Sequence, residues 1–328
     1  MKKEKRIEKI IFDDRWHGEN GISRFSREIL RRIEFVNILS GSNPFSLFQT
    51  MKISLSAKKN NYKIFSPGFI TGIKNVGYIC IHDTNHLDIE DNSSLLKRTI
   101  YRNYIFHLVR RCDAVFTVSN FSKNQIIKWT KCSPEKVIVV GNGTSDCFTP
   151  KEIKEREKKY IFCCSNRKKH KNEITLIYAF KKSCLYEKYD LIFSGAKNTE
   201  HEEIIRNLDL SREVLYTGNL TDEQLAQYYS GAEFSVFPSL YEGFGLPIIE
   251  SMACGTPVIC SNATAIPEVG GDAAIYFSPL NIDELSTAMK TLDQNKELRN
   301  SMIKKGFENV KRFTWNRVVD KIKTEIEK

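Results

Sequence analysis

Residues 239–250 read SLYEGFGLPIIE and place two carboxylates, Glu242 and Glu250, on either side of a Gly-x-Gly turn. The short apolar run 232–237 ahead of them predicts a buried β-strand. The run 248–254 predicts a helix that stops at the glycine after it. Glu242 is therefore expected in a strand-to-helix loop at the carboxyl edge of a sheet, where ligands of open α/β sheets bind.

The turn between the two glutamates suits a ligand site. Gly243 and Gly245 let the backbone approach a ligand closely and leave amides free to donate. Two acidic residues in a loop are, by themselves, more often solvated surface groups than ligand contacts. Here the loop also holds the apolar Phe244 and Leu246, and residues 252–259 continue into another short buried strand. This setting favours a site over a plain surface loop.

The longer run SLYEGFGLPIIESMACGTPVI, residues 239–259, resembles the donor-site signature of retaining glycosyltransferases of family 4. The glutamate-x7-glutamate spacing is typical of that family, which has the GT-B fold. The resemblance extends over most of residues 8–328 and is strongest from 137 to 280. It implies an α/β protein of two Rossmann-like, doubly wound parallel-sheet domains that face each other across a cleft.

The same resemblance implies a division of labour between the domains. An N-terminal domain over residues 1–148 is expected to bind the acceptor, and a C-terminal domain over 149–312 to bind a nucleotide-sugar donor. The last segment, 313–328, is expected to be a helix that packs back on the N-terminal domain. A length of 328 residues agrees with two domains, each large enough for its own core.

Strands and helices alternate along the chain, which predicts parallel sheets covered by helices on both faces. No apolar run approaches the roughly 20 residues that a membrane-spanning helix needs. Ser119 is expected to cap the helix that follows it. Strands are expected near residues 8–13, 36–40, 62–66, 77–81, 113–118, 136–141, 159–164, 189–194, 213–216, 233–237, 257–260 and 274–277. In the first half, helices are expected near residues 22–33, 94–111 and 120–130.

The net positive charge of the chain belongs entirely to its first half. Residues 1–150 hold 24 Lys and Arg against 14 Asp and Glu, whereas residues 151–328 hold 26 of each. An anionic partner is therefore expected on the first half, and an anionic membrane surface or a nucleic acid would fit. Nucleic acid is disfavoured because the cations are not interleaved with stacking aromatic residues. The nine cysteines show no paired C-x-x-C spacing, so we expect reduced, mainly buried thiols and no zinc site.

Further positions match motifs of the family, and their roles are those that the resemblance implies. Arg167 and Lys171 would lie against the donor phosphates, and His82 would contact the transferred sugar. Glu250 would accept hydrogen bonds from the ribose, and Glu242 would lie near the sugar. The remaining donor-binding positions lie in three segments. They are the glycine ahead of the first helix (Gly21), the segment near the base (Thr217, Gly218 and Leu220) and the loop between the glutamates (Gly243, Phe244, Gly245 and Leu246).

The resemblance implies a retaining transfer without a metal or other cofactor. His86, Asp88, Glu90 and Asp91 lack tight metal-ligand spacing. The donor would be a GDP- or UDP-sugar, with mannose the first choice. The acceptor would be a saccharide or a lipid-linked saccharide of bacterial surface polysaccharide synthesis, such as lipopolysaccharide O-antigen or capsule. The alternatives are another GT-B enzyme, such as a sugar-phosphate synthase, and a non-enzymatic nucleic-acid-binding protein.

The segment 94–111 predicts an amphipathic helix with a basic side. Lys97, Arg98 and Arg102 lie near one another on one stripe, and Leu96, Ile100, His107 and Arg111 fall on another. Such a helix is usually a core helix with a solvated basic face. Together with the charge of the first half, it favours a cytoplasmic protein bound peripherally to the inner face of the cytoplasmic membrane.

Overall fold

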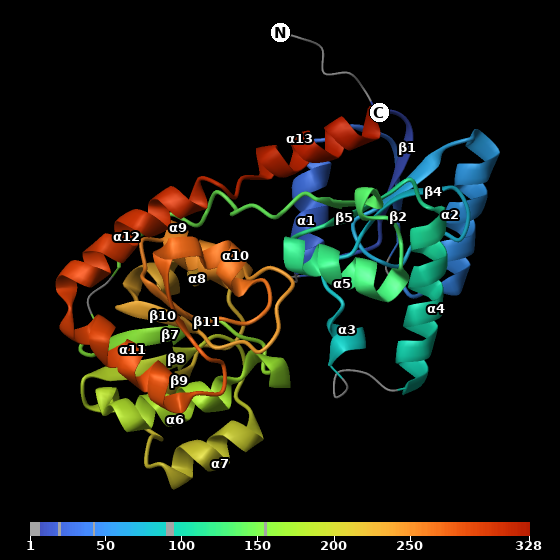
Figure 1. The fold of residues 1–328 in the computed structure, drawn as a ribbon. Helices are drawn as coiled ribbons and strands as arrows, with labels where there is room; N and C mark the ends of the chain where they lie inside the picture. Colours follow the sequence, from blue (N-terminus) through green and yellow to red (C-terminus); the bar gives the residue numbers. More distant parts are fainter. Residues whose placement is uncertain (1–6, 19–20, 42, 90–94, 154–155) are drawn as a thin grey trace. The chain divides into compact units, whose positions relative to one another are not determined.

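The computed structural model of the protein describes residues 7–18, 21–41, 43–89, 95–153 and 156–328. The chain forms two compact units (Figure 1). The first comprises Met1–Gly143 and Thr314–Lys328, and the second comprises Thr144–Phe313. The boundaries expected from the sequence, 148/149 and 312/313, lie within a few residues of these. Each unit is built on a six-stranded parallel sheet, and all twelve strands lie where the sequence predicted strands.

The first unit has the strand order β2-β1-β3-β4-β5-β6. Helices lie on both faces of its sheet. The strands are β1 (Ile7–Asp14), β2 (Phe35–Ser40), β3 (Lys63–Ser66), β4 (Val76–Cys80), β5 (Ala114–Thr117) and β6 (Val137–Val139). The helices are α1 (Gly21–Leu30), α2 (Leu47–Asn60), α3 (Asn85–Asp88), α4 (Leu95–Arg111), α5 (Asn120–Thr130), a 3₁₀ turn (Pro134–Lys136) and α13 (Trp315–Ile326).

Apolar side chains on both faces of this sheet make its two cores. Phe12 packs on the side of α1 and α13, whereas its neighbour Ile11 packs on the side of α2 and α4. Successive side chains of a strand point to opposite faces, so a strand covered on both sides must be apolar throughout. From α13, Trp315, Val318 and Ile322 enter the first core, at the spacing of one helical stripe.

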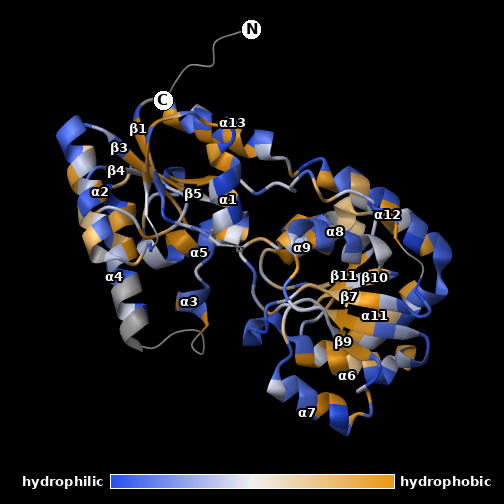
Figure 2. Ribbon diagram, turned by 180° about the vertical axis from the view of Figure 1, so that it is seen from behind, coloured by the Kyte–Doolittle hydropathy of each residue, from blue (hydrophilic) through white to orange (hydrophobic). Residues whose placement is uncertain are grey.

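The second unit has the strand order β12-β11-β10-β7-β8-β9. In both units the strands form a hydrophobic layer (Figure 2). The strands are β7 (Lys159–Cys163), β8 (Tyr189–Phe193), β9 (Val214–Tyr216), β10 (Phe234–Phe237), β11 (Val258–Ser261) and β12 (Ala274–Phe277). The helices are α6 (Glu173–Ser183), α7 (Thr199–Asn207), α8 (Asp222–Gly231), α9 (Leu246–Ala253), α10 (Ile266–Gly270), α11 (Ile282–Gln294) and α12 (Lys296–Val310), with 3₁₀ turns at Lys169–Lys171, Leu185–Glu187 and Gly271–Ala273.

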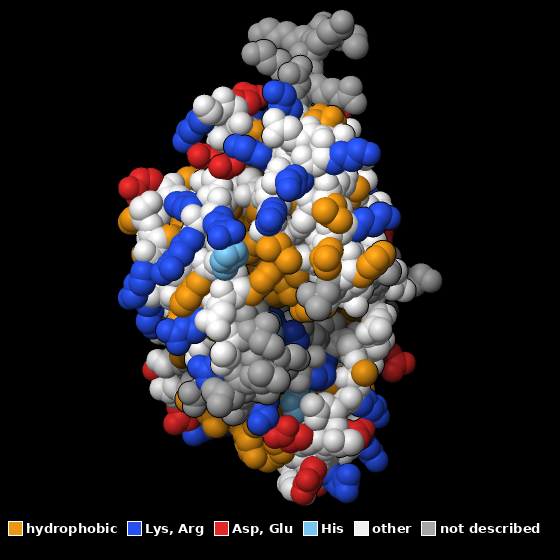
Figure 3. Space-filling model, turned by 90° about the vertical axis from the view of Figure 1, so that its right-hand side faces the viewer, with side chains coloured by type: hydrophobic (Ala, Val, Ile, Leu, Met, Phe, Trp, Pro, Cys, Tyr) orange, Lys and Arg blue, Asp and Glu red, His pale blue; other side chains and the backbone are white. Residues whose placement is uncertain are grey.

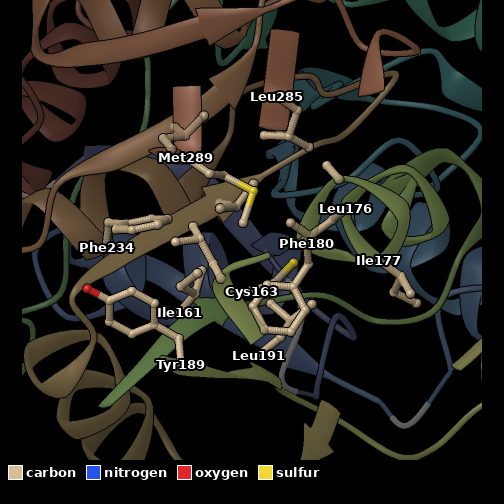
Figure 4. Packing of buried hydrophobic residues seen from close by; sticks show 14 of the residues in the cluster. Ile161, Cys163, Leu176, Ile177, Phe180, Tyr189, Leu191, Phe234, Leu285 and Met289 are labelled. Atoms are coloured by element: carbon tan, nitrogen blue, oxygen red, sulfur yellow. The ribbon is translucent and has the colours of Figure 1, made fainter. Parts of the chain in front are cut away.

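The main core of the second unit lies between its sheet and the helices α6 and α11. Ile161 and Phe234 from the strands meet Phe180 from α6 and Met289 from α11, and all four are fully or almost fully buried (Figure 4). Burying side chains of this size stabilises a fold by roughly 1.5–3 kcal/mol each. The core therefore fixes the sheet on which the loops at the carboxyl edge are mounted.

The sequence analysis missed two helices of the first unit, the four-residue α3 and the longer α2. The miss of α2 has a physical reason. Its buried side chains, such as Ile53 and Ala57, lie on one side, but Phe48, Met51 and Leu55 on the other side are exposed. Because both sides carry apolar residues, the sequence has no single apolar stripe of period 3.6 by which to recognise a surface helix.

The helix cap predicted at Ser119 is confirmed. The hydroxyl of Ser119 accepts the Ser122 amide at 3.0 Å and caps α5. Helix α9 begins at Leu246, two residues earlier than predicted, because Pro247 suits the first turn of a helix. All nine cysteines are free and five of them are buried. Within the described residues, no helix combines the length and the apolar character that crossing a membrane requires.

A fully buried ion pair lies at the carboxyl end of β1. The guanidinium of Arg15 donates to both carboxylate oxygens of Asp13, at 2.7 and 2.8 Å. The hydroxyl of Thr71 donates to the same carboxylate at 2.9 Å, and Arg15 also donates to the Thr50 hydroxyl at 3.1 Å. These bonds join β1 to α2 and to the segment after β3.

Substituting Asp13→Ala should destabilise the first unit by about 3–5 kcal/mol, because a buried guanidinium loses its carboxylate. The measurement is urea unfolding followed by circular dichroism. The matched control is Lys63→Ala, which breaks an exposed pair with Asp113 (2.7 Å) in the same unit and should cost less than about 1 kcal/mol. Equal losses in the two variants would contradict the assignment.

Candidate functional site

Both sheets reverse their strand order at one point, and several of the predicted site residues follow the strands on either side of it. In the second unit the chain runs outward from β7 to β8 and β9, then returns to the other side of β7 with β10. In the first unit the corresponding point lies between β1 and β3. In open α/β sheets, ligands bind outside the carboxyl ends of the strands at such a switch point.

A buried ion pair spans the switch point of the second unit. The ammonium of Lys171, after β7, donates to Glu242 Oε1, after β10, at 2.6 Å. The two side chains are only 13% and 15% exposed. Burial lowers the pKa of Lys171, but the adjacent Glu242 carboxylate outweighs this effect and raises the pKa above its ordinary value. Lys171 is therefore charged at neutral pH, and its ammonium also lies 5.3 Å from the ring centre of Phe237.

Hydrogen bonds hold the two loops of the switch point together. Asn172, in the left-handed conformation with φ 55°, donates from Nδ2 to the carbonyls of Pro238 at 3.0 Å and Pro279 at 2.6 Å. The amide of Leu240 donates to the carbonyl of His170 at 2.7 Å. The loops after β7, β10 and β12 are thus fixed to one another, which positions Lys171 and Glu242 before any ligand binds.

Thr264 supports Glu242 from the loop after β11. Its hydroxyl accepts the Glu242 amide at 2.9 Å and donates to the Glu242 carbonyl at 3.0 Å. The sequence analysis did not single out Thr264. Its place in the loop that follows a strand at the same sheet edge was the signal that could have identified it.

Arg167 makes internal contacts with its guanidinium group. It stacks on Phe193 and Tyr216, with 5.0 and 5.1 Å to the ring centres. It donates to the buried carboxylate of Glu173 in α6 and to two backbone carbonyls after β8. Glu173 was not recognised in the sequence as its partner. Arg167 is thus fixed between β7, β8 and α6, and the pair that directly bridges the switch point is Lys171 and Glu242.

Glu250 lies on α9 and is 2% exposed. The phenol of Tyr229, on α8, donates to Glu250 Oε2 at 3.4 Å. Burial raises the pKa of Tyr229 well above its ordinary value, so this phenol remains a donor. Tyr229 was also missed, because a single tyrosine within an amphipathic helix carries no positional signal.

The loop between the glutamates turns sharply into α9. Gly245 caps the helix with φ 113°, a conformation that side-chain-bearing residues rarely adopt. Phe244 is buried and packs edge-on against Phe313, with ring centres 5.6 Å apart. Gly243 is buried and Leu246 is half-buried. This turn brings the first amides of α9 to the sheet edge that carries Glu242.

The segment predicted to lie near a nucleotide base follows β9. The amide of Thr217 donates to the carbonyl of Phe193 at 3.0 Å. Gly218, with φ 73°, exchanges two backbone hydrogen bonds with Gly195 after β8, at 2.8 and 3.1 Å. Leu220 is half-buried against the core around α8. Backbone groups therefore dominate this part of the sheet edge.

The predicted residues of the first unit follow β1 and β4 at the carboxyl edge of its sheet. Gly21 is the exposed first residue of α1. His82 follows β4, packs edge-on against Phe25 of α1 at 5.0 Å, and is 3.0 Å from the carbonyl of Pro67 after β3. Since a carbonyl only accepts, Nε2 of His82 carries the proton and Nδ1 is the acceptor in the neutral ring. Burial lowers the pKa of His82 to about 4, although the Pro67 hydrogen bond opposes this.

The cations predicted for a membrane or acceptor contact lie on α4. Arg98 donates to the carbonyl of Leu87 at 3.0 Å. The guanidinium of Arg102 lies 5.5 Å from the ring centre of Phe106 and 5.7 Å from that of Trp129. The side chain of Lys97 lies outside the described residues. The stripe of Leu96, Ile100, His107 and Arg111 does not face the core at its described end. There His107 and Arg111 are exposed, and the buried contacts are made by Ile105, Leu108 and Val109.

The described part of the chain contains no group of three or more His, Cys, Asp or Glu side chains arranged to hold a metal ion. Both carboxylate oxygens of Asp88 accept hydrogen bonds, from the Thr84 hydroxyl at 2.6 Å and the Trp129 indole at 2.8 Å. Glu90 and Asp91 lie outside the described residues.

Two family descriptions match the chain, one for each unit. Glycosyl transferases group 1 matches residues 147–309, and Glycosyltransferase Family 4 matches residues 11–146. Together these matches cover most of the chain and include the switch points of both sheets.

Among curated proteins, the chain is 31% identical over 216 residues to O-antigen chain mannosyltransferase B of Escherichia coli. This alignment covers 61% of the chain and 57% of that protein. It is 34% identical over 199 residues to MMP alpha-(1->4)-mannosyltransferase of Mycolicibacterium hassiacum, covering 58% of this chain and 48% of the relative. The chain thus spans about half the length of these two relatives. O-antigen chain mannosyltransferase RfbU of Salmonella typhimurium is 29% identical over 249 residues, 73% of this chain and 68% of the relative.

Solved structures share the fold over nearly the whole chain. Anabaena HepE, crystallised with UDP-glucose, gives a TM-score of 0.80 at 16% identity and covers 97% of this chain and 99% of its own. Sucrose-phosphate synthase of Thermosynechococcus elongatus gives 0.79 at 19% identity, with 96% and 97% covered. At these identities the likeness concerns the fold, which is that of the GT-B glycosyltransferases.

The depressed pKa of His82 predicts a pH-dependent stability. Because the folded state holds this ring neutral down to about pH 4, its contribution is complete above pH 6.5 and is lost as the pH falls from 6.5 towards 4. The loss should be on the order of 2–3 kcal/mol. The measurement compares urea unfolding of the wild type and of His82→Gln at several pH values. Parallel profiles for the two proteins would contradict the prediction.

Proposed function

Because the chain belongs to the group 1 glycosyltransferases of family 4, we propose that it is a retaining, metal-independent hexosyltransferase. It transfers a sugar from a nucleotide diphospho-sugar to a saccharide or lipid-linked acceptor. The second unit binds the donor, and the first unit binds the acceptor. The observation that carries this proposal is the buried Lys171–Glu242 pair at the switch point, together with the buried Glu250 on α9.

Glu250 binds the ribose in this proposal. A carboxylate accepts two hydroxyl donors at once, and Tyr229 holds one of its oxygens from the buried side. Glu242 lies near the transferred sugar. The amides of Phe244, Gly245 and Leu246, at the N-terminal end of α9, donate to sugar hydroxyls and phosphate oxygens.

Fixed cations stabilise the leaving nucleoside diphosphate. An ammonium has three donors, so Lys171 can keep its bond to Glu242 and still donate to a phosphate oxygen. Arg167 adds a second positive charge at the end of β7, held in place by Glu173 and two aromatic rings. Charges fixed before the reaction stabilise developing negative charge without reorganisation, which removes the need for a metal ion.

The transfer retains the configuration at the anomeric carbon. The acceptor hydroxyl attacks that carbon on the face from which the diphosphate departs. The bond from the anomeric carbon to the phosphate oxygen breaks, the bond to the acceptor oxygen forms, and a phosphate oxygen of the donor takes the proton. In the first unit, Gly21 faces the diphosphate, and neutral His82 contacts the sugar as a hydrogen-bonding group rather than as a cation.

Mannose is the proposed sugar, because the three curated relatives reported above are named as mannosyltransferases. Two of them carry O-antigen chain in their names, which favours synthesis of a bacterial surface polysaccharide such as O-antigen or capsule. The proposed setting is the cytoplasmic face of the membrane, where a lipid-linked acceptor would be presented. A sugar-phosphate synthase remains the alternative, and transfer to a soluble sugar phosphate instead of a saccharide would identify it.

Substituting Glu250→Ala should weaken donor binding roughly 100-fold and nearly abolish transfer, because two charged hydrogen bonds to the ribose are lost, about 3 kcal/mol. Titration calorimetry with GDP-mannose and a panel of GDP- and UDP-sugars measures the affinity, and release of the nucleoside diphosphate measures the transfer. The matched control is Glu308→Ala, an exposed glutamate of the same unit paired with Lys311, which should bind as the wild type does. Wild-type turnover in a folded Glu250→Ala protein would refute the assignment.

Activity should persist in excess EDTA, because Lys171, Arg167 and the α9 amides supply the positive charge. Lys171→Met should lower the rate about a hundredfold or more, whereas Lys168→Met, at an exposed position of the same loop, should leave the rate nearly unchanged. The rate is measured with and without chelator. Loss of activity in EDTA that Mg²⁺ or Mn²⁺ restores would show that a metal takes the role given to Lys171.

A further inference from the structure

Helix α2 presents large apolar side chains to solvent. Phe48 is 77% exposed, Met51 57% and Leu55 64%, and Phe45, just ahead of the helix, is 65% exposed. Isolated apolar residues on a surface are ordinary, but a contiguous group of four large ones usually marks a binding surface. These residues belong to no part of the donor or acceptor site described above.

The opposite side of α2 already forms part of the core. Ile53 and Ala57 are buried against the sheet, and Thr50 is buried beside Arg15. At 3.6 residues per turn, Phe48 and Leu55 lie on the side of the helix away from these positions. The exposed side is therefore a second apolar face, which packing within the unit does not explain.

The charged side chains of α2 are all basic. Lys52, Lys58 and Lys59 share the exposed half of α2. Residues 35–82 contain five lysines and no aspartate or glutamate. Figure 3 shows this side of the molecule, where apolar side chains gather in the middle and Lys and Arg side chains surround them.

Further basic side chains lie near the C-terminal end of α2, around a hollow at the amino edge of the sheet. The amide of Ile73, itself 41% exposed, donates to the hydroxyl of Ser54 on α2 at 2.8 Å. Next to it a hollow of about 940 Å³ opens at the amino edge of the sheet. Its lining includes more basic than acidic residues: Lys9, Lys63, Lys74 and Arg111 against Asp113 and Glu327.

We infer that the exposed face of α2, formed by Phe45, Phe48, Met51, Leu55, Lys52, Lys58 and Lys59, docks the first unit on an anionic lipid bilayer. A helix that combines aromatic and aliphatic side chains with lysines lies in the membrane interface, where acyl chains take up the former and lipid phosphates attract the latter. A second copy of the chain would set lysines against lysines, so charge complementarity favours the bilayer. The inference does not depend on the proposed reaction and moves the contact from α4 to α2.

Co-sedimentation with vesicles tests this inference. The full chain should bind vesicles of phosphatidylcholine mixed with phosphatidylglycerol at low salt, and much less to phosphatidylcholine alone. Binding should weaken as salt is added. Phe48→Ser/Leu55→Ser should reduce the bound fraction at least tenfold, and each of Lys52→Glu and Lys59→Glu should weaken partitioning about fivefold or more. Unchanged circular dichroism shows that these exposed substitutions leave the fold intact.

Matched controls separate this face from other surfaces. Leu280→Ser and Lys304→Glu replace exposed residues of the second unit and should bind vesicles as the wild type does. If Arg98→Glu/Arg102→Glu abolished binding while the α2 variants bound normally, the inference would be overturned in favour of α4. Equal binding to neutral and anionic vesicles, or none to either, would also overturn it. So would a dimer in light scattering that Phe48→Ser/Leu55→Ser dissociates while vesicle binding is absent.

Discussion

The arrangement of the second unit depends on how the loops after β7 and β10 are held together across the strand-order reversal. The carboxyl ends of the parallel strands lie side by side at this point. Asn172 links the loops that follow them by donating to the carbonyls of Pro238 and Pro279. The Lys171–Glu242 ion pair joins the same loops after β7 and β10. A buried ion pair does little for stability, so its value here lies in fixing two charges at the sheet edge before a ligand arrives.

Each unit holds a buried arginine–carboxylate pair near its own switch point. In the first, Arg15 binds Asp13 after β1, and in the second, Arg167 binds Glu173 after β7. Both pairs join a loop at the carboxyl edge to the elements beside it. The planar guanidinium suits this task, because its donors are arranged in a fixed fork and can reach a carboxylate and backbone carbonyls together. In both units an arginine therefore ties a loop at the carboxyl edge to neighbouring elements.

The two faces of α2 show how one helix can serve packing and recognition together. Its inner side chains pack into the core between the sheet and α4. Phe48 and Leu55, on the outer side, remain exposed to water and contribute no burial to the stability of the unit. Three exposed lysines accompany them on α2, whereas Arg98 and Arg102 of α4 make contacts within the unit.

The sequence by itself determined the twelve strands, the family and the sheet edge that carries Glu242 and Glu250, because short apolar runs and glycine turns are local signals. It did not reveal α2, whose apolar residues face two ways. Only the tertiary structure decided the partners: Glu242 for Lys171, Glu173 for Arg167, Tyr229 for Glu250 and Thr264 for the Glu242 backbone. These contacts join segments distant in sequence, and a parallel sheet sets them by its strand order, which no local pattern encodes.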